Sequence, residues 1–440
     1  VQHHAGYPDV YLASRKKLVV TIHAAAGDIR TCELLIFSRT SPEKISSYLM
    51  QRVTRDGVRD HFTAEVITED TLRYLKYYFR LTDTAGKIYF QNAWETSENE
   101  PEDGFYEFLY ANETNVLKVP EWAKGVIYYQ IFPERFANGD SSNDPSGCQE
   151  WGTSPNRENY MGGDLSGILK NLEYLNSLGV ECLYLNPIFR AYSNHRYDTG
   201  DYLQIDPILG TMEDFNELIR SCNERGIRVI LDGVFNHTGS NSRYFNKYGE
   251  YDSVGAYQSK ESPYYTWFRF MDWPDVYESW WGMTTLPQIE EHSEECRKYL
   301  LSDKDAIVKR WIKNGASGWR LDVVDELPGF FVKELRENVK KADKDAVIIG
   351  EVWEDASNKS AYGERREYFL GKELDSVMNY PMRRALIDAV SGRIDVEEFD
   401  ARLMSIKENY PAPAYYSLLN IITSHDVERI MTRMGDAPSR

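Results

Sequence analysis

The spacing of hydrophobic positions changes close to residue 118. Before it, short runs rich in β-branched and aromatic residues are separated by polar stretches, which predicts strands with one buried face. The Asp-Thr-Ala-Gly sequence at residues 83–86 is typical of a hairpin turn between two such runs. We therefore predict a β-sandwich over residues 1–118, with strands at residues 18–23, 32–37, 62–67, 77–82 and 87–90.

Near-continuous apolar runs follow from residue 119 onward, with helical spacing between them. Ile168, Leu172 and Leu175, for example, recur at the spacing of one helix face. Fully buried parallel strands produce such apolar runs, and their alternation with helices predicts an α/β fold, a TIM (β/α)8 barrel over residues 119–440. The predicted barrel strands begin at residues 125, 180, 228, 318, 347, 376 and 420.

No eighth strand and no C-terminal β domain can be recognised before Arg440. We therefore expect the chain to be part of a longer protein. Because an open barrel exposes unpaired strand edges, we also expect residues 1–440 to need the missing part for stability. A monodisperse preparation that unfolds cooperatively would refute this expectation.

The alternation of helix and strand fails between Thr238 and about Cys296. This segment is crowded with Tyr, Trp and Phe, including the pair Trp280 and Trp281. A loop this long in a compact barrel usually carries function. We predict a small insertion domain over residues 238–296, after the third barrel strand.

Composition narrows the range of partners. The 440 residues are 42% hydrophobic and 27% charged, with a formal net charge of −18 and a pI of about 5.0. The negative charge argues against nucleic acid and anionic membrane surfaces, and no apolar run approaches the roughly 18 residues of a membrane span. The 31 Tyr and 10 Trp suit stacking on the apolar faces of sugars, although large barrels also bury many aromatic residues.

The five cysteines are scattered and lack the spacing of metal ligands: Cys32, Cys148, Cys182, Cys222 and Cys296. We interpret them as free thiols in a reducing compartment, which predicts a cytoplasmic protein. No secretory signal opens the chain, but it begins with Val1, so secretion after removal of a signal is the alternative.

Candidate chemistry is concentrated in residues 318–326, Gly-Trp-Arg-Leu-Asp-Val-Val-Asp-Glu. Residues i and i+2 of a strand share a face, so Arg320 and Asp322 are expected to point the same way. The guanidinium would keep the carboxylate ionised, as a nucleophile requires. Taken alone, however, this stretch favours a buried structural ion pair at the end of a strand.

Three further apolar strands end in carboxylates or histidines. Catalytic groups of parallel α/β barrels lie at the C-terminal ends of the strands. Four such strands in order therefore predict one active site. Besides residues 318–326, the polar ends carry Asp232, Asn236 and His237, then Glu351, and then His425 and Asp426.

These four regions resemble the signature regions of the α-amylase family of glycoside hydrolases, and the resemblance extends from about Gly125 to the end of the chain. It implies that Asp322 is the nucleophile, Glu351 the general acid/base and Asp426 the carboxylate that stabilises the transition state. It also implies that Arg320 pairs with Asp322, that His237 and His425 donate hydrogen bonds to the sugar, and that Asp232 and Asn236 are supporting residues.

The N-terminal sandwich is placed as in neopullulanases, cyclomaltodextrinases and maltogenic amylases, which this chain resembles. In those relatives it helps to form a dimer and to wall the active site, so the resemblance implies a homodimer through residues 1–118. The His-x-Tyr pattern of His195 and Tyr197 resembles a family pattern that supplies a histidine near the site and a tyrosine under the cleaved sugar. Asp198 would have a supporting role, and a tyrosine that caps the core is the alternative for Tyr197.

Asn and Asp oxygens cluster with glycines after the first barrel strand. This suits a hard cation such as calcium, although many loops have this composition without a metal. The resemblance to the neopullulanase group implies a structural calcium and no organic cofactor. The implied ligands are Asn138, Asp140, Asn143, Asp144, the backbone of Gly162, and Asp164.

The resemblance implies retaining hydrolysis of α-glucosidic bonds in pullulan, cyclomaltodextrins, starch or malto-oligosaccharides, with the carboxyl groups of Asp322 and Glu351 about 5 to 5.5 Å apart. Two signatures depart from neopullulanases: Leu-Pro-Gln-Ile-Glu at residues 286–290 replaces Met-Pro-Lys-Leu-Asn, and Val-Asp-Glu at residues 324–326 replaces Ala-Asn-Glu. The preference for α-1,4 or α-1,6 bonds therefore stays open, and an amylopullulanase-like relative is allowed.

Two further alternatives remain. A transglycosylase would use the same three carboxylates but would let a sugar hydroxyl replace water. A carbohydrate-binding protein on an inactive barrel would typically lack one of the three carboxylates, and all three are present.

Overall fold

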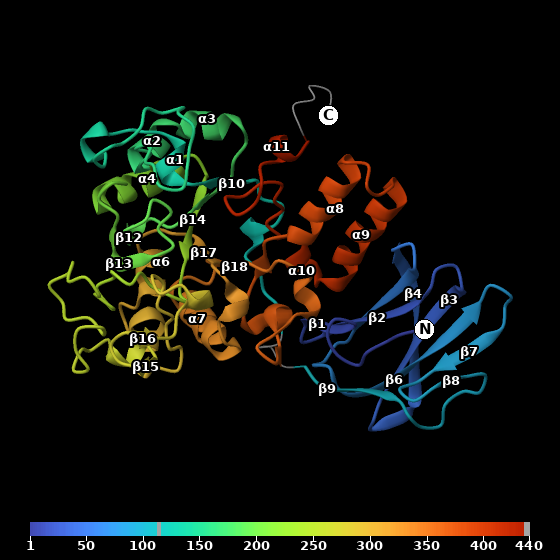
Figure 1. Ribbon diagram of the computed structural model, residues 1–440. Coiled ribbons are helices and arrows are strands. Elements are labelled where there is room, and N and C mark those ends of the chain that lie inside the picture. Colours follow the sequence, from blue (N-terminus) through green and yellow to red (C-terminus); the bar gives the residue numbers. More distant parts are fainter. Residues whose placement is uncertain (112–115, 435–440) are drawn as a thin grey trace.

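A computed structural model of the chain describes residues 1–111 and 116–434 (Figure 1). A region of β-strands, blue to cyan in Figure 1, lies beside helix α9 (Val396–Asn409) of a larger region in which strands and helices alternate. The two regions are joined by direct contacts. The hydroxyl of Tyr7 donates to the carbonyl of Asn409 at 3.5 Å, and the Arg365 guanidinium donates to the carbonyl of Tyr7 at 2.9 Å.

The N-terminal strands form two antiparallel layers connected by the long strand β4. The first half of β4 pairs with β3 and its last residues pair with β5, so the strand passes from one layer to the other. The apolar faces of both layers, with Leu18, Leu34 and Phe79, meet in one core. The strands are β1 (Val10–Ser14), β2 (Lys17–Ala25), β3 (Ile29–Ser38), β4 (Ser41–Arg55), β5 (Arg59–Ile67), β6 (Arg73–Asp83), β7 (Ile88–Gln91), β8 (Thr96–Ser97) and β9 (Tyr106–Tyr110).

All five strands predicted in this region are present, and the turn at residues 83–86 joins β6 to β7. The prediction missed β1, β4, β8 and β9. Most side chains of β4 are exposed, so its sequence lacks the apolar alternation on which the prediction depended.

The larger region is built on a parallel sheet with the strand order β10-β11-β14-β17-β18-β21, the neighbour-to-neighbour order expected of a barrel. These strands are short and almost entirely buried from β11 onward. They are β10 (Tyr128–Ile131), β11 (Cys182–Leu185), β14 (Arg228–Gly233), β17 (Gly318–Leu321), β18 (Val347–Gly350) and β21 (Ser376–Val377).

The predicted seventh barrel strand is wrong within the described residues. Only Met378 and Leu419 pair there, as an isolated parallel bridge. The apolar run is just Ile421 and Ile422, and Ile422 is 45% exposed, so the segment lacks the two buried faces of a barrel strand. The helix predicted from the spacing of Ile168, Leu172 and Leu175 is also divided in two. The side chain of Asn171 donates to the carbonyl of Gly167 at 2.8 Å, and the helix is interrupted there.

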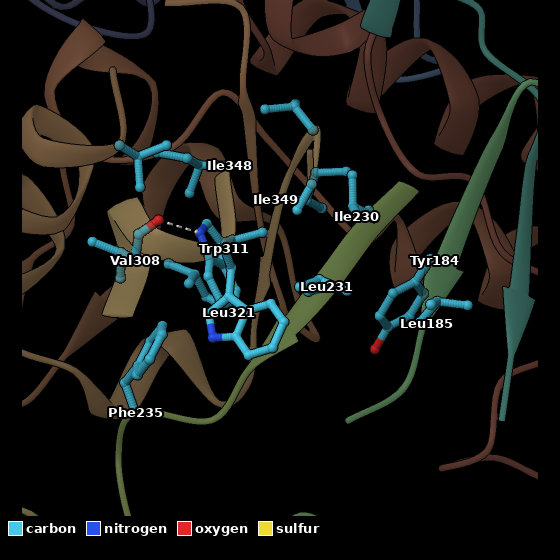
Figure 2. Close-up of a cluster of buried hydrophobic side chains, with 14 of the residues drawn as sticks. Tyr184, Leu185, Ile230, Leu231, Phe235, Val308, Trp311, Leu321, Ile348 and Ile349 are labelled. Atoms are coloured by element: carbon cyan, nitrogen blue, oxygen red, sulfur yellow. Dashed lines mark hydrogen bonds between the residues drawn. The ribbon is translucent and has the colours of Figure 1, made fainter. Parts of the chain in front are cut away.

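Helices cover the outside of the sheet (Figure 1). Figure 2 shows Ile230 and Leu231 of β14, Leu321 of β17 and Ile348 and Ile349 of β18 in one cluster with Val308 and Trp311 of α6. The described α-helices are α1 (Pro133–Phe136), α2 (Leu165–Lys170), α3 (Leu172–Ser177), α4 (Met212–Glu224), α5 (Glu294–Arg297), α6 (Ile307–Lys313), α7 (Gly329–Ala342), α8 (Tyr380–Val390), α9, α10 (Ala412–Tyr415) and α11 (Ile430–Met434).

Residues 238–296 contain little regular structure, apart from the hairpin β15 (Phe270–Asp272) and β16 (Val276–Tyr277). Stacked aromatic rings hold the segment together, and the rings of Tyr244 and Trp267 lie 5.0 Å apart and nearly parallel. Two other short hairpins complete the fold: β12 (Phe189–Ala191) with β13 (Thr199–Ile205), and β19 (Ser360–Ala361) with β20 (Glu364–Arg365). None of the helices in residues 1–111 and 116–434 combines the length and apolar character that crossing a bilayer requires.

Candidate active site

The register of three neighbouring strands brings the carboxylates together. In the parallel pairing of β14 with β17, Asp232 lies beside Arg320, and in that of β17 with β18, Arg320 lies beside Ile349. Because side chains two residues apart on a strand share a face, Asp322 and Glu351 extend from the same face one step further along. The C-terminal ends of the three strands therefore converge on one point, as the sequence predicted.

Arg320 is the hub of this cluster. One of its guanidinium nitrogens lies 3.0 Å from Asp232 and 2.7 Å from Asp322, and the other lies 3.0 Å from Glu351. The side chain of Arg320 is fully buried. The sequence predicted a pair with Asp322 alone, whereas the structure shows one cation shared by three carboxylates.

This excess of carboxylates changes the expected electrostatics. Burial raises the pKa of Asp322, Arg320 opposes the shift, and Glu351 and Asp232 add to it. Burial also raises the pKa of Asp232. The prediction that Arg320 keeps Asp322 ionised considered one pair only. With three buried carboxylates around one guanidinium, the cluster retains a proton, because full ionisation would leave two uncompensated buried charges.

Glu351 is held at both carboxylate oxygens. Its Oε2 accepts from the backbone N–H of Val323 at 2.8 Å, and its Oε1 accepts from the indole N–H of Trp353 at 3.2 Å. Val323 has a φ of 39°, in the left-handed region that β-branched residues rarely adopt. This conformation is strained, and its effect is to turn the amide that follows Asp322 toward Glu351.

Asp426 follows His425 on the segment after Leu419. Nδ1 of His425 accepts from the side-chain amides of Gln130 at 2.8 Å and Asn186 at 3.1 Å, so the ring proton lies on Nε2, which is 3.3 Å from the Asp426 carboxylate. Burial lowers the pKa of His425 to about 3, so the ring is neutral. Burial and the charge of Glu351 raise the pKa of Asp426 to about 6.

Tyr197 lies under this group. Its ring stacks on His425 with 5.2 Å between centroids, and its hydroxyl donates to Asp232 at 2.8 Å. Tyr197 also lines the cleft described below, and its place beside the reacting sugar stays a prediction. Tyr184 of β11 holds Asp232 from the other side, with a hydroxyl hydrogen bond of 2.5 Å.

The ring of His237 lies in the cleft wall, but both nitrogens already have partners. Nε2 donates to the carbonyl of Tyr197 at 3.1 Å, and Nδ1 accepts from the Asn236 side chain at 3.2 Å. Burial lowers the pKa of His237 to about 4. In this arrangement His237 positions the Tyr197 main chain and has no hydrogen left to donate to a sugar.

The remaining predicted residues lie at the edge of the site. His195 lines the cleft, and its Nδ1 accepts from the backbone N–H of Tyr197 at 3.1 Å. Asp198 is not among the residues that line the cleft, and it accepts hydrogen bonds from Ser193, which shapes the loop. Asn236 is buried, and its Oδ1 has no hydrogen-bond partner among the described residues.

A cleft of about 1170 Å³ opens over the carboxylates. Asp322, Glu351 and Asp426 lie along it, and aromatic side chains form its walls. The insertion supplies Trp280 and Trp281 from a short 3-10 helix (Trp280–Gly282). Trp281 is 79% exposed, and its indole N–H donates to Glu326 at 3.0 Å.

Several functional contacts were missed from the sequence. Gln130 had a signal, because it is a polar residue within the apolar run of the first barrel strand. Glu326 is notable in the sequence only as the last residue of the segment 324–326, which differs from the neopullulanase signature. Nothing in the sequence indicates that it holds Trp281 across the cleft. The left-handed Val323 likewise has no signal, because glycine is the residue that marks such a position.

The residues implied as calcium ligands are brought together on two adjacent loops. The side-chain amide of Asn138 donates to Asp144 at 2.7 Å, and a Cβ on Gly162 would lie 2.4 Å from both side chains. Asp164 is the N-cap of α2 and also accepts from the amides of Gly139 and Asp140. Asn143 has a buried Oδ1 with no partner among the described residues. Nowhere in those residues do three His, Cys, Asp or Glu side chains converge as a metal site.

Comparison with known proteins gives two family matches. The family described as alpha amylase, catalytic domain, matches residues 130–440, and the family described as alpha amylase, N-terminal ig-like domain, matches residues 1–112. The chain is also similar to neopullulanase 2 of Thermoactinomyces vulgaris, with 36% identity over 98% of this chain and 72% of that protein.

Two more similarities bear on the fold. An amylopullulanase of Thermoanaerobacterium thermosulfurigenes is 40% identical over 72% of this chain, which corresponds to 19% of that much longer protein. A solved cyclomaltodextrinase structure superposes with a TM-score of 0.85 at 32% identity, over 97% of this chain and 71% of that one. Together with the parallel strand order, these matches confirm the predicted barrel and the N-terminal β-sandwich.

Proposed function

The chain belongs to the α-amylase family of glycoside hydrolases, and from this premise we propose that it cleaves α-1,4-glucosidic bonds with retention, through a covalent glycosyl-enzyme. The observation that carries the proposal is the cluster in which one buried guanidinium holds Asp322 and Glu351 while Asp426 faces the same cleft. Membership of the family gives the class of reaction, and the geometry supports the roles proposed below.

In the first step a carboxylate oxygen of Asp322 attacks the anomeric carbon. The 2.7 Å contact with Arg320 orients this carboxylate and favours its charged form. As the general acid, Glu351 must carry a proton when it acts, and it gives this proton to the departing glycosidic oxygen. The Val323 amide and the Trp353 indole, which hold the two oxygens of Glu351, fix the direction of this transfer.

In the second step Glu351, now a carboxylate, removes a proton from water, and the resulting hydroxide displaces Asp322 from the sugar. Asp426 adds negative potential beside the oxocarbenium-like transition state. The Nε2–H of His425 lies 3.3 Å from the carboxylate of Asp426. Tyr197 supplies the apolar floor under the ring that reacts.

The nucleophile can be tested with Asp322→Ala and azide. We expect the variant to be inactive alone, and azide to restore cleavage with inversion, because the small anion enters from the face that the carboxylate occupied. Asp426→Ala is the matched control, since azide cannot replace a group that forms no bond to the sugar. Azide rescue in the control but not in Asp322→Ala would refute the assignment.

For the substrate we propose pullulan and cyclomaltodextrins, because the relatives are named neopullulanase and cyclomaltodextrinase. The similarity to amylopullulanases favours a second candidate with α-1,6 specificity. Product analysis separates them: panose from pullulan together with rapid opening of cyclomaltodextrin means α-1,4 cleavage, and maltotriose means α-1,6 cleavage. No product from pullulan, cyclomaltodextrin or starch would refute hydrolysis and support the inactive-barrel alternative.

We propose that calcium binds between the loop of residues 138–144 and Gly162. The unpartnered Oδ1 of Asn143, the Asp144 carboxylate and the close approach of Gly162 to Asn138 supply the oxygen donors that calcium prefers. Asp140 and Asp164 accept backbone hydrogen bonds in this arrangement and would join as ligands through their remaining lone pairs. When bound, the ion would stabilise the two loops against each other and take no part in bond cleavage.

We propose a homodimer through the N-terminal sandwich. Ile45, Leu49 and Val53 of β4 are 46%, 68% and 40% exposed, which leaves apolar side chains on the surface. Sedimentation of the wild type against Leu49→Lys tests this, because a buried lysine would dissociate the dimer. A wild type that sediments as a monomer refutes the proposal.

All five cysteines are unpaired within the described residues, which supports the proposed cytoplasmic location.

A further inference from the structure

The main chain that carries Asp426 is almost free of regular hydrogen bonds. Within residues 1–111 and 116–434, the segment from Ile421 to Glu428 belongs to no helix or strand, and its one regular feature is a turn at His425 and Asp426. Asp322 and Glu351, in contrast, each follow a barrel strand whose ladder fixes the backbone. Asp426 therefore needs another source of rigidity if its carboxylate is to meet the sugar in one position.

The side chain of Asp426 does not supply that rigidity. Its closest polar partner is Nε2 of His425 at 3.3 Å, and its backbone N–H donates to the hydroxyl of Ser424 at 3.3 Å. His425 is fixed by Gln130 and Asn186, but these contacts hold the histidine ring and not the residue after it. The position of Asp426 is consequently set by how its loop is tied on both sides.

Arg383 ties that loop at both ends. Its Nε–H donates to the carbonyl of Ile422 at 2.8 Å, and its Nη2–H donates to the carbonyl of Glu428 at 3.4 Å. The two carbonyls bracket Ser424, His425 and Asp426. A planar guanidinium with several donors can span two carbonyls in this way, whereas a single ammonium binds one of them well.

Arg383 is suited to this task because it stands on a rigid element and forms no salt bridge with any carboxylate in the described part of the chain. It lies in the first turns of α8, which the Asn379 side chain caps through the amide of Met382. Asp388, the acidic residue nearby on the same helix, is already paired with Arg393 at 3.1 Å and Arg402 at 3.0 Å. A cavity of about 150 Å³ borders Arg383 and Trp353, so water could reach the two carbonyls if the guanidinium were removed.

We propose that Arg383 is a positioning residue that holds the loop of Asp426 in its reactive place. The inference rests on the role of Asp426 in the proposed function. Arg383 does not line the catalytic cleft, so its effect on the reaction passes through the loop. A misplacement of the order of 1 Å is enough to lower a rate by about 100-fold, which is the scale on which losing the two ties would act.

The test is a mutant cycle between Arg383→Gln and Asp426→Asn, measured as kcat and KM on maltopentaose. We expect Arg383→Gln to lower kcat by about 10- to 100-fold and to change KM by less than about two-fold, because the loop contributes to the transition state rather than to ground-state binding. In the Asp426→Asn background we expect Arg383→Gln to have no further effect. Arg383→Lys, which keeps the charge but has only one nitrogen to reach the two carbonyls, should retain activity between the wild type and Arg383→Gln.

The matched control is Arg384→Gln, the same change at the next residue of the helix, which has no hydrogen bond to the loop among the described residues. It should leave kcat unchanged. Losses from Arg383→Gln and Asp426→Asn that multiply in the double variant would overturn the proposal, as would full activity of Arg383→Gln. If Arg383→Gln does not fold, the cycle is run with Arg383→Lys. An Asp426→Asn variant with wild-type activity would instead refute the role of Asp426, so the two failures are distinguishable.

Discussion

Replacing Arg320 by Met tests the charge balance on which the site depends. The guanidinium is fully buried and lies within 3.0 Å of each of Asp232, Asp322 and Glu351. Met has a similar length and no charge, so the change leaves three carboxylates without a cation. Removing one partner of a buried ion pair typically costs about 3 to 5 kcal/mol, and we expect a loss of unfolding free energy at or above that range at pH 7.

The loss should shrink as the pH falls. Burial raises the pKa values of Asp322 and Asp232, and the variant also loses the influence of Arg320 that lowers them. Between the ordinary carboxyl pKa and these raised values, the native variant binds more protons than the unfolded chain, so its stability increases toward low pH. One additional proton taken up between pH 7 and pH 5 would restore at most about 2.7 kcal/mol.

The measurement is urea unfolding of both proteins at pH 7, 6 and 5, followed by tryptophan fluorescence. Arg336→Met is the matched control, because Arg336 is also buried and lies 2.8 Å from Asp375, which keeps Lys340 at 2.7 Å as a second cation. The control should lose less stability and show little change with pH. A loss for Arg320→Met that stays constant from pH 7 to pH 5, or that is smaller than the loss of the control, would refute the reasoning.

Three other predictions concern the cleft and the metal. Trp281→Ala should raise KM for malto-oligosaccharides by about 10-fold with little change in kcat, because the exposed indole offers a stacking surface; an unchanged KM would contradict this. Asp426 has a pKa of about 6 and must be ionised, so kcat/KM should fall as the pH drops through about 6. If the same fall in kcat/KM is also seen in Asp426→Asn, it belongs to another group and the prediction is refuted. Chelation with EDTA should lower the Tm, and Asn143→Ala should remove the gain on adding calcium back; equal Tm values with and without calcium would refute the metal site.

Local patterns were reliable where burial and chemistry act over a few residues. Apolar runs at residues 228–231 and 347–349 became β14 and β18, and the polar residues after them reached the same edge of the sheet. The exposed strand β4 was missed because its side chains carry no burial signal. The strand expected at residues 420–423 was wrong because two apolar residues do not establish a strand without a partner to pair with.

Contacts between distant segments could not be predicted in detail. Arg320 and Glu351 are separated by a helix and a strand, and only the register of β17 with β18 places them 3.0 Å apart. The sequence therefore suggested an ion pair with Asp322 alone. It missed the sharing of Arg320 among three carboxylates and the burial that raises the pKa of Asp322. The tie between Arg383 and the loop of Asp426 is of the same kind, because one partner is a main-chain carbonyl, which every residue has.

The sequence by itself determined which strands carry polar ends, the order in which those ends occur and the family to which the motifs are similar. These properties depend on side-chain alternation and residue type, which can be read locally. The tertiary structure alone decided how many carboxylates share Arg320, which main-chain strain turns Val323 toward Glu351, and what holds Asp426. Those features depend on register and on packing between segments far apart in the chain, and their energies arise only when the barrel has brought the charges out of water.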